Sequence, residues 1–220
     1  MTTHRQRTWG TAIVLLALTA LAFGQAAAKL PADLDPESRA RLPYIEKKDD
    51  VDGKAQRLFD TFKPANGKLS GPLAFAAYNP RVATALLDLH DGAYAGTLDA
   101  RTRELAILVA CRETNYNLEW NGHERSAVRA GVDAKVIDIV RKNGALTGLD
   151  EKDATIIRFG RQLLHDKKMD SATFAKAVEF WGKKGAMDIV AVMSTYAVSG
   201  FYAIAVDEHM APGQPELPAK

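Results

Sequence analysis

Hydrophobic residues recur at helical spacing through most of this chain, from about residue 55 to residue 207. Ala55, Leu58, Phe59 and Phe62 show the pattern, with intervals of three and four residues along one helical face. No stretch shows the strict alternation, bounded by hairpin turns, that is typical of strands. The connections between periodic segments are short, as in helical bundles. The sequence therefore predicts an all-α fold, a compact multi-helix bundle.

Local start and stop signals place the helices within that region. Asn79-Pro80 combines a capping residue with proline at the first helical position. Aspartates stand at three further starts, Asp99, Asp133 and Asp150, and Ser171 opens a later one. We expect helices over 55–62, 80–90, 99–114, 115–130, 133–140, 150–164, 171–181 and 186–207.

The N-terminal segment, residues 1–28, has the order of an export signal. Arg5 and Arg7 precede an apolar run of about 12 residues, and Ala26-Ala27-Ala28 supplies small residues for cleavage. A membrane-spanning helix needs roughly 20 apolar residues, so an uncleaved anchor is the less favoured alternative. We predict cleavage near Ala28 and a periplasmic or secreted protein.

The remainder reads as one domain with two short flanks. Residues 29–50 are rich in Pro, Asp, Lys and Arg and suggest an extended lead-in, 51–210 hold the helical pattern, and 211–220 form a Pro-rich tail that we expect to be mobile. After cleavage, 27 basic and 27 acidic side chains balance without a basic block. Nucleic acid is therefore not an expected partner.

The last apolar segment, 186–206, is long enough to cross a membrane. It contains Ser194, Thr195, Ser199 and Gly200, however, and it is not flanked on both sides by basic and aromatic anchors. A helix that is apolar on all sides also suits a domain centre or a subunit interface. We expect that role, and no membrane association after signal cleavage.

Two consecutive helices carry ionisable or polar groups on faces that should point inward. Glu104 shares a face with Ile107, Leu108 and Cys111, and Tyr116, Glu119, Trp120 and His123 follow the same spacing on the next helix. Burial moves carboxylate and histidine pKa values toward neutrality, which suits general acid–base catalysis. The alternative is structural: Glu104 pairs with an arginine, and His123 is a hydrogen-bonded core histidine.

These same residues carry a resemblance to a known family. Three segments, 98–107, 116–123 and 130–132, resemble the carboxymuconolactone decarboxylase family, which shares its fold with the alkyl hydroperoxidase D-like proteins. The resemblance covers roughly residues 55 to 207. It implies an all-α fold assembling into trimers or hexamers, with the site near subunit contacts.

The resemblance also implies roles for individual residues. Glu104 corresponds to the family's proton-relay glutamate and His123 to its site histidine, and we expect Glu119 to join them as a catalytic residue. Tyr116, Trp120 and Arg101 are the expected substrate-binding residues. The peroxidase branch carries a Cys-x-x-Cys pair where this chain has Tyr116 and Glu119, so dithiol chemistry has no second thiol.

Three functions remain open from the sequence. The first is a cofactor-independent lyase acting on a small carboxylated lactone or cyclic acid, and the second is a non-catalytic oligomer of the cell envelope that binds a small ligand. The third is a peroxidase or thiol-redox protein using Cys111, the only cysteine. Glu104, Glu119 and His123 would make a two-carboxylate, one-histidine metal set, but no zinc-protease motif accompanies them and we expect no metal. The namesake decarboxylation belongs to intracellular catabolism, so an exported relative is expected to act on another substrate.

Overall fold

The computed structural model describes residues 30–51, 53, 56–62, 67–69, 71 and 73–219. The predicted signal peptide lies outside these residues, as does Ala55 at the start of the first expected helix. Within the described part, seven α-helices and three short helical segments account for the regular structure, and one isolated bridge pairs Ile45 with Leu69. The predicted all-α class is confirmed.

The helices follow the expected order, and most of their starts follow from local capping. The α-helices are α1 (Gln56–Phe62), α2 (Pro80–Tyr94), α3 (Ala100–Glu113), α4 (Asn117–Arg129), α5 (Ala134–Arg141), α6 (Glu151–Gly160) and α7 (Ser171–Ala205). The short segments are η1 (Lys48–Asp50), η2 (Phe75–Tyr78) and η3 (Arg161–Asp166). The side chains of Asn79, Asp99, Asp133 and Asp150 each accept a backbone N–H of the first turn, as predicted.

The last two expected helices are one element in the structure. Asp170, not Ser171, caps α7, and the helix continues for 35 residues past a kink at Gly182, whose φ of 67° and ψ of 174° are not helical. Glycine adopts positive φ without the steric penalty of other residues. The chain therefore changes direction at Gly182 without a separate loop.

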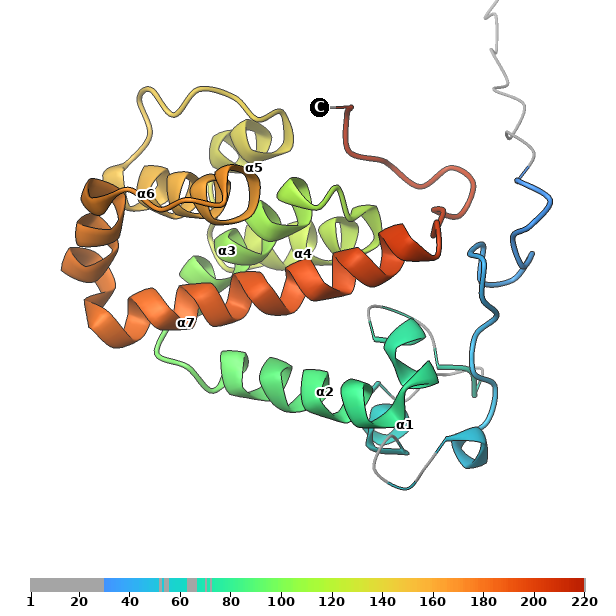
Figure 1. Cartoon of the computed structure of the whole chain (residues 1–220). Helices are drawn as coiled ribbons and strands as arrows, with labels where there is room; N and C mark the ends of the chain where they lie inside the picture. Colours follow the sequence, from blue (N-terminus) through green and yellow to red (C-terminus); the bar gives the residue numbers. More distant parts are fainter. Residues whose placement is uncertain are drawn as a thin grey trace, which may run out of the picture.

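Helix α3 lies at the centre of the larger core. Every residue from Glu104 to Arg112 is buried, because α4, α5, α6 and α7 all pack against this helix. Figure 1 shows α7 crossing in front of α3 and α4, with α2 on its other side. A second, smaller core joins α1, α2 and residues of the lead-in around Leu58, Leu69 and Leu87.

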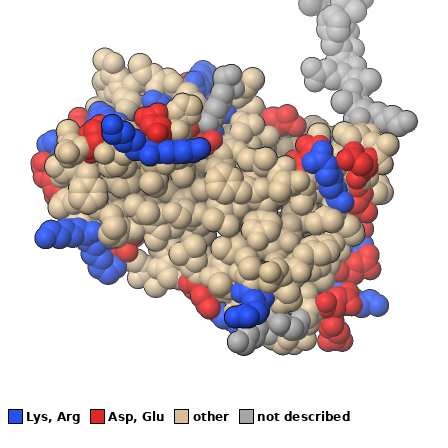
Figure 2. Space-filling view, in the orientation of Figure 1, with Lys and Arg blue, Asp and Glu red and all other residues tan. Residues whose placement is uncertain are grey.

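The second half of helix α7 carries large apolar residues on its solvent side as well as on its core side. Met187, Phe201 and Ile204 are exposed, whereas Ile189, Val192 and Met193 are fully buried. The centre of the face in Figure 2 is correspondingly uncharged, with Lys, Arg, Asp and Glu toward its rim. By length and composition α7 passes as a membrane span, but half of its most apolar window is buried inside the protein.

The lead-in and the segment after α7 meet at the C-terminus of α7. Arg41 donates its backbone N–H to Val206 O at 2.7 Å, and the N–H of His209 donates to Arg39 O at 3.0 Å. The tail, predicted to be mobile, lies along α4: Asn121 Nδ2 donates to Pro215 O, and Leu217, which is buried, donates its N–H to Asn117 Oδ1. These tail contacts were not expected from the sequence.

Candidate functional site

A tight turn between α3 and α4 brings their inward faces together. Asn115 adopts a left-handed conformation with φ 54°, and the N–H of Tyr116 donates to Cys111 O at 2.8 Å. Left-handed asparagine with this hydrogen bond is a usual way to end a helix. The turn sends α4 back beside α3, so that groups nineteen residues apart in the chain can meet.

Glu104, Glu119 and His123 form one connected cluster, a convergence that the sequence pattern left open. His123 Nδ1 lies 2.8 Å from Glu104 Oε2, and its Nε2 lies 3.3 Å from Glu119 Oε2. The His123 side chain is only 16% exposed. The imidazole therefore bridges two largely buried carboxylates from α3 and α4.

The carboxylates determine the protonation state of His123. Burial lowers the pKa of His123, but the hydrogen bonds to Glu104 and Glu119 outweigh it and raise that pKa to about 9. At neutral pH the imidazole is a cation, which donates from Nδ1 to Glu104 and forms an ion pair through Nε2 with Glu119. Glu104 and His123 thus hold a proton beside Glu119.

Two tyrosines that the sequence pattern did not single out complete the cluster. The Tyr196 ring from α7 meets the His123 ring edge-on, with 4.8 Å between centroids, and its hydroxyl lies 2.7 Å from the Tyr94 hydroxyl of α2. Burial raises the pKa of Tyr196. Tyr196 lies within the 186–206 segment, which is uncharged apart from Asp188, and its hydroxyl was one of several in that mostly apolar stretch.

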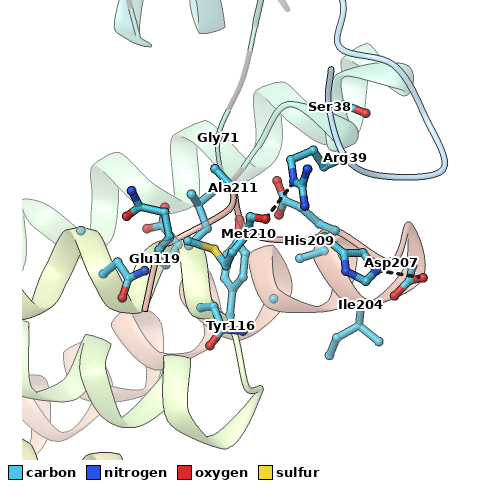
Figure 3. A pocket seen from close by; sticks show the side chains of 18 of the residues that line it. Ser38, Arg39, Gly71, Tyr116, Glu119, Ile204, Asp207, His209, Met210 and Ala211 are labelled. Atoms are coloured by element: carbon cyan, nitrogen blue, oxygen red, sulfur yellow. Dashed lines mark hydrogen bonds and ion pairs between the residues drawn. The ribbon is translucent and has the colours of Figure 1, made fainter. Parts of the chain in front are cut away.

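A cavity of about 780 Å³ opens beside this cluster. Its walls come from the start of α4, the end of α7, the lead-in and the segment after α7 (Figure 3). Tyr116 and Glu119 line it, together with Arg39, Arg125 and Glu208. Glu119 therefore has one side toward the cavity and the other toward His123, while Glu104 and His123 do not line the cavity.

Gly200 allows α7 to approach this corner closely. A Cβ atom at Gly200 would stand 2.6 Å from Thr114 Oγ1 and 3.4 Å from Tyr116 Cβ. A Cβ atom 2.6 Å from Thr114 Oγ1 is closer than real Cβ atoms approach, whereas 3.4 Å is ordinary van der Waals contact. The backbone of α7 thus forms part of the cavity wall next to Tyr116.

Arg101 and Trp120, predicted to bind substrate, lie elsewhere. Both terminal nitrogens of Arg101 donate to the buried Asp153 carboxylate, at 2.6 and 2.8 Å. Trp120 is buried, and its Nε1 donates to Glu124 Oε2 at 2.8 Å. Neither residue lines the cavity, and each is engaged with an acidic partner.

The structure also bears on thiol chemistry at Cys111 and on metal binding by the acidic and histidine side chains. Cys111 is fully buried in the core, and burial raises the pKa of its thiol well above the usual value. Across the described ranges, no group of three or more His, Cys, Asp or Glu side chains is arranged to hold a metal ion. Glu104 and Glu119 each contact His123 instead, Glu104 through a hydrogen bond and Glu119 through an ion pair.

Comparison with known families identifies the segment that carries this cluster. Residues 80–159 match the model of the carboxymuconolactone decarboxylase family. The chain carries a carboxymuconolactone decarboxylase family domain. That domain spans α2 to α6 and includes Glu104, Glu119 and His123, whereas α7 and the lead-in lie outside it. No curated protein matches the chain.

Proposed function

We propose that this protein is a cofactor-independent lyase acting on a small carboxylated lactone or cyclic acid by general acid–base chemistry. One observation carries the proposal. Glu119 lies in the cavity wall and is hydrogen-bonded to a protonated His123, which is held from behind by Glu104. Glu119 therefore connects a substrate-sized cavity to the buried, protonated imidazole of His123, which can supply a proton.

The chain's own residues account for each requirement of a decarboxylation. When the bond to the departing carboxylate breaks, its electron pair passes into the conjugated carbonyl as a dienolate, and a carbon atom must then take up a proton. Glu119 can accept the Nε2 proton of His123 and deliver it into the cavity, while Glu104 keeps the imidazole in place. Arg39 and Arg125 in the wall provide positive charge for the substrate carboxylate.

The proposal is tested by turnover. Protein lacking residues 1–28 is incubated with a series of carboxylated lactones, and carbon dioxide release and ring ultraviolet absorbance are followed. We expect Glu119→Gln and His123→Gln to lower kcat by about 10²-fold or more, and Glu179→Gln, an exposed glutamate of α7, to leave it unchanged. Lack of turnover with every lactone would reject the lyase and leave the ligand-binding oligomer as the better hypothesis.

The thiol-redox alternative has a simpler test. A buried thiol with a raised pKa forms little thiolate, and Cys111 is the only cysteine of the chain. We expect a thiol reagent such as dithiobis-nitrobenzoate to label Cys111 only after unfolding. Rapid labelling of the native protein, together with peroxide reduction that Cys111→Ser abolishes, would favour the redox protein.

Localisation and assembly are part of the same proposal. The N-terminal pattern supports a periplasmic or secreted protein, which cell fractionation and N-terminal sequencing of the mature form would test. The exposed Met187, Phe201 and Ile204 on α7 support a homo-oligomer. Light scattering during size-exclusion chromatography should then give the mass of a trimer or hexamer, and a monomeric mass would reject the assembly.

A further inference from the structure

Glu208 is a second carboxyl group in the cavity, and its backbone is fixed on both sides. Asp207 adopts a left-handed conformation with φ 52° just after α7, and the N–H of Glu208 donates to Ala203 O at 2.9 Å. This is the hydrogen bond that closes a helix C-terminus. The next residue, His209, donates its N–H to Arg39 O. Glu208 is therefore held by the helix end and the lead-in together.

The surroundings of the Glu208 side chain favour its protonated form. Glu208 lines the cavity together with Glu119 and Tyr116, and its Oε2 atom is buried without a hydrogen-bond partner in the described part of the chain. Burial and the charge of Glu119 raise the pKa of Glu208 to about 7, although a hydrogen bond from the Tyr116 hydroxyl lowers that pKa. The other ionisable groups around this part of the cavity are Glu37, Arg39, Tyr44, Arg125, Asp207 and His209.

An unpartnered buried oxygen on a protonated carboxyl has a clear chemical use. Because Glu208 lines the cavity and its Oε2 atom has no protein partner among the described residues, a proton on this carboxyl is available to a group that binds there. A neutral acid in a poorly solvated site is an effective donor to developing negative charge. Glu119 differs because it is paired with the cationic His123. Two carboxyl groups of one cavity are thus kept in different environments, which is a pattern that separates acid and base roles.

We propose that Glu208 is the electrophilic acid of the site, donating a hydrogen bond from its protonated carboxyl to the carbonyl oxygen of a lactone or cyclic ketone acid. The proposal deepens the proposed function and rests on it. As the bond to the carboxylate breaks, the electron pair moves onto that carbonyl oxygen, and the Glu208 O–H stabilises the resulting dienolate. The carbon atom receives its proton from His123 through Glu119, carbon dioxide leaves, and solvent returns a proton to His123. Glu208 lies outside the family domain at 80–159, so the family match assigns it no role.

The protonation state of Glu208 can be measured without turnover. Infrared difference spectra recorded across pH 5 to 9 report the C=O stretch of a protonated carboxyl. We expect a carboxyl that titrates near pH 7 in the wild type, is missing in Glu208→Gln, is retained in Glu208→Asp, and titrates at lower pH in Glu119→Gln. Glu216→Gln, an exposed tail glutamate, should leave the signal in place. A spectrum without a carboxyl titrating above about pH 6, or one that keeps it in Glu208→Gln, would overturn the proposal.

Hydrogen-bond donation by Glu208 can be measured from the infrared carbonyl stretch of a bound lactone. A saturated γ-butyrolactone that bears its carboxylate on the γ-carbon cannot decarboxylate by this route, because the electron pair cannot reach the ring carbonyl. The stretching frequency of that carbonyl falls when it accepts a strong hydrogen bond. We expect that shift on binding to the wild type and its loss in Glu208→Leu, whereas unshifted binding to the wild type would overturn the proposal. On a substrate that turns over, Glu208→Leu should lower kcat about 10²-fold with KM changed much less. Failure of every lactone to bind would reject the proposed function and the donor role together, and the carboxyl titration would still identify whether Glu208 is the protonated acid.

Discussion

His123 on α4 donates from Nδ1 to Glu104 on α3, with 2.8 Å between nitrogen and oxygen. The same imidazole reaches Glu119 one helical turn away. The cation therefore neutralises two carboxylates that would otherwise repel each other in a largely buried position. This relationship makes His123 important for folding as well as for the proposed chemistry.

Removal of the imidazole should destabilise the protein markedly. In His123→Ala, Glu104 and Glu119 remain largely buried without their shared cation, and breaking such a pair costs about 3–5 kcal/mol. We expect a loss of that order in the free energy of unfolding at pH 7, measured by urea denaturation. His165→Ala, at an exposed histidine, should change it by less than about 0.5 kcal/mol. Equal stability of the two variants would show that the cluster contributes little to folding.

The same cluster predicts how stability depends on pH. His123 has a folded pKa of about 9, above the value of about 6.5 for unfolded chains. Its contribution is therefore complete below pH 6.5 and is lost as pH rises through 9. The stability difference between wild type and His123→Ala should shrink by about 3 kcal/mol between pH 6.5 and pH 10. A difference that stays constant over that range would mean that His123 is not protonated in the folded protein.

Local signals predicted one part of this site and not the other. Glu119 and His123 lie one helical turn apart, so their meeting follows from α-helical periodicity. The contact of His123 with Glu104 depends on the left-handed Asn115 between α3 and α4, and a single residue of that kind is not specified by hydrophobic spacing. The predicted caps at Asn79 and Asp99 were confirmed because capping involves only neighbouring residues.

The features that hydrophobic periodicity did not predict depend mostly on contacts between residues far apart in the sequence. Arg101 appeared available for a substrate because Asp153, its partner, is 52 residues further along. Glu208 carried no signal at all, since its burial depends on packing between the lead-in and the end of α7. The separation of 171–181 from 186–207 was also wrong, because the glycine kink at Gly182 redirects α7 without ending it.

The Arg101–Asp153 pair should act on stability and leave ligand binding unchanged. The Asp153 side chain is only 6% exposed, and in Arg101→Ala it would lose two charge-assisted hydrogen bonds. We expect a loss of about 2–4 kcal/mol in the free energy of unfolding and an unchanged KM or ligand affinity. Arg158→Ala, which removes a longer and more exposed pair with Glu151, should cost less than about 1 kcal/mol. A weakened affinity with undiminished stability would instead support the substrate-binding role predicted from the sequence.

Close helix packing at Gly160 gives a prediction that can be checked by a double mutant. A Cβ atom at Gly160, the last residue of α6, would overlap Val109 Cγ1 of α3 and lie 3.0 Å from Met193 Cε of α7. Gly160→Ala should therefore lower the free energy of unfolding by about 1–3 kcal/mol, even though alanine is the better helix former. Gly92→Ala, in α2, meets nothing within 4 Å and should raise it by up to about 1 kcal/mol.

Combining Gly160→Ala with Val109→Ala tests whether steric overlap with Val109 causes the loss of stability, rather than another effect of the added methyl group. Val109→Ala alone removes buried methyl groups and should cost about 1–3 kcal/mol, but it also removes the atom that Gly160→Ala would meet. Because the two substitutions share one contact, their combined cost should be smaller than the sum of the single costs by about 1 kcal/mol or more. Urea denaturation of the four proteins measures this coupling. Strict additivity would show that α6 and α3 can separate at this position, and that the glycine is not required for their close approach.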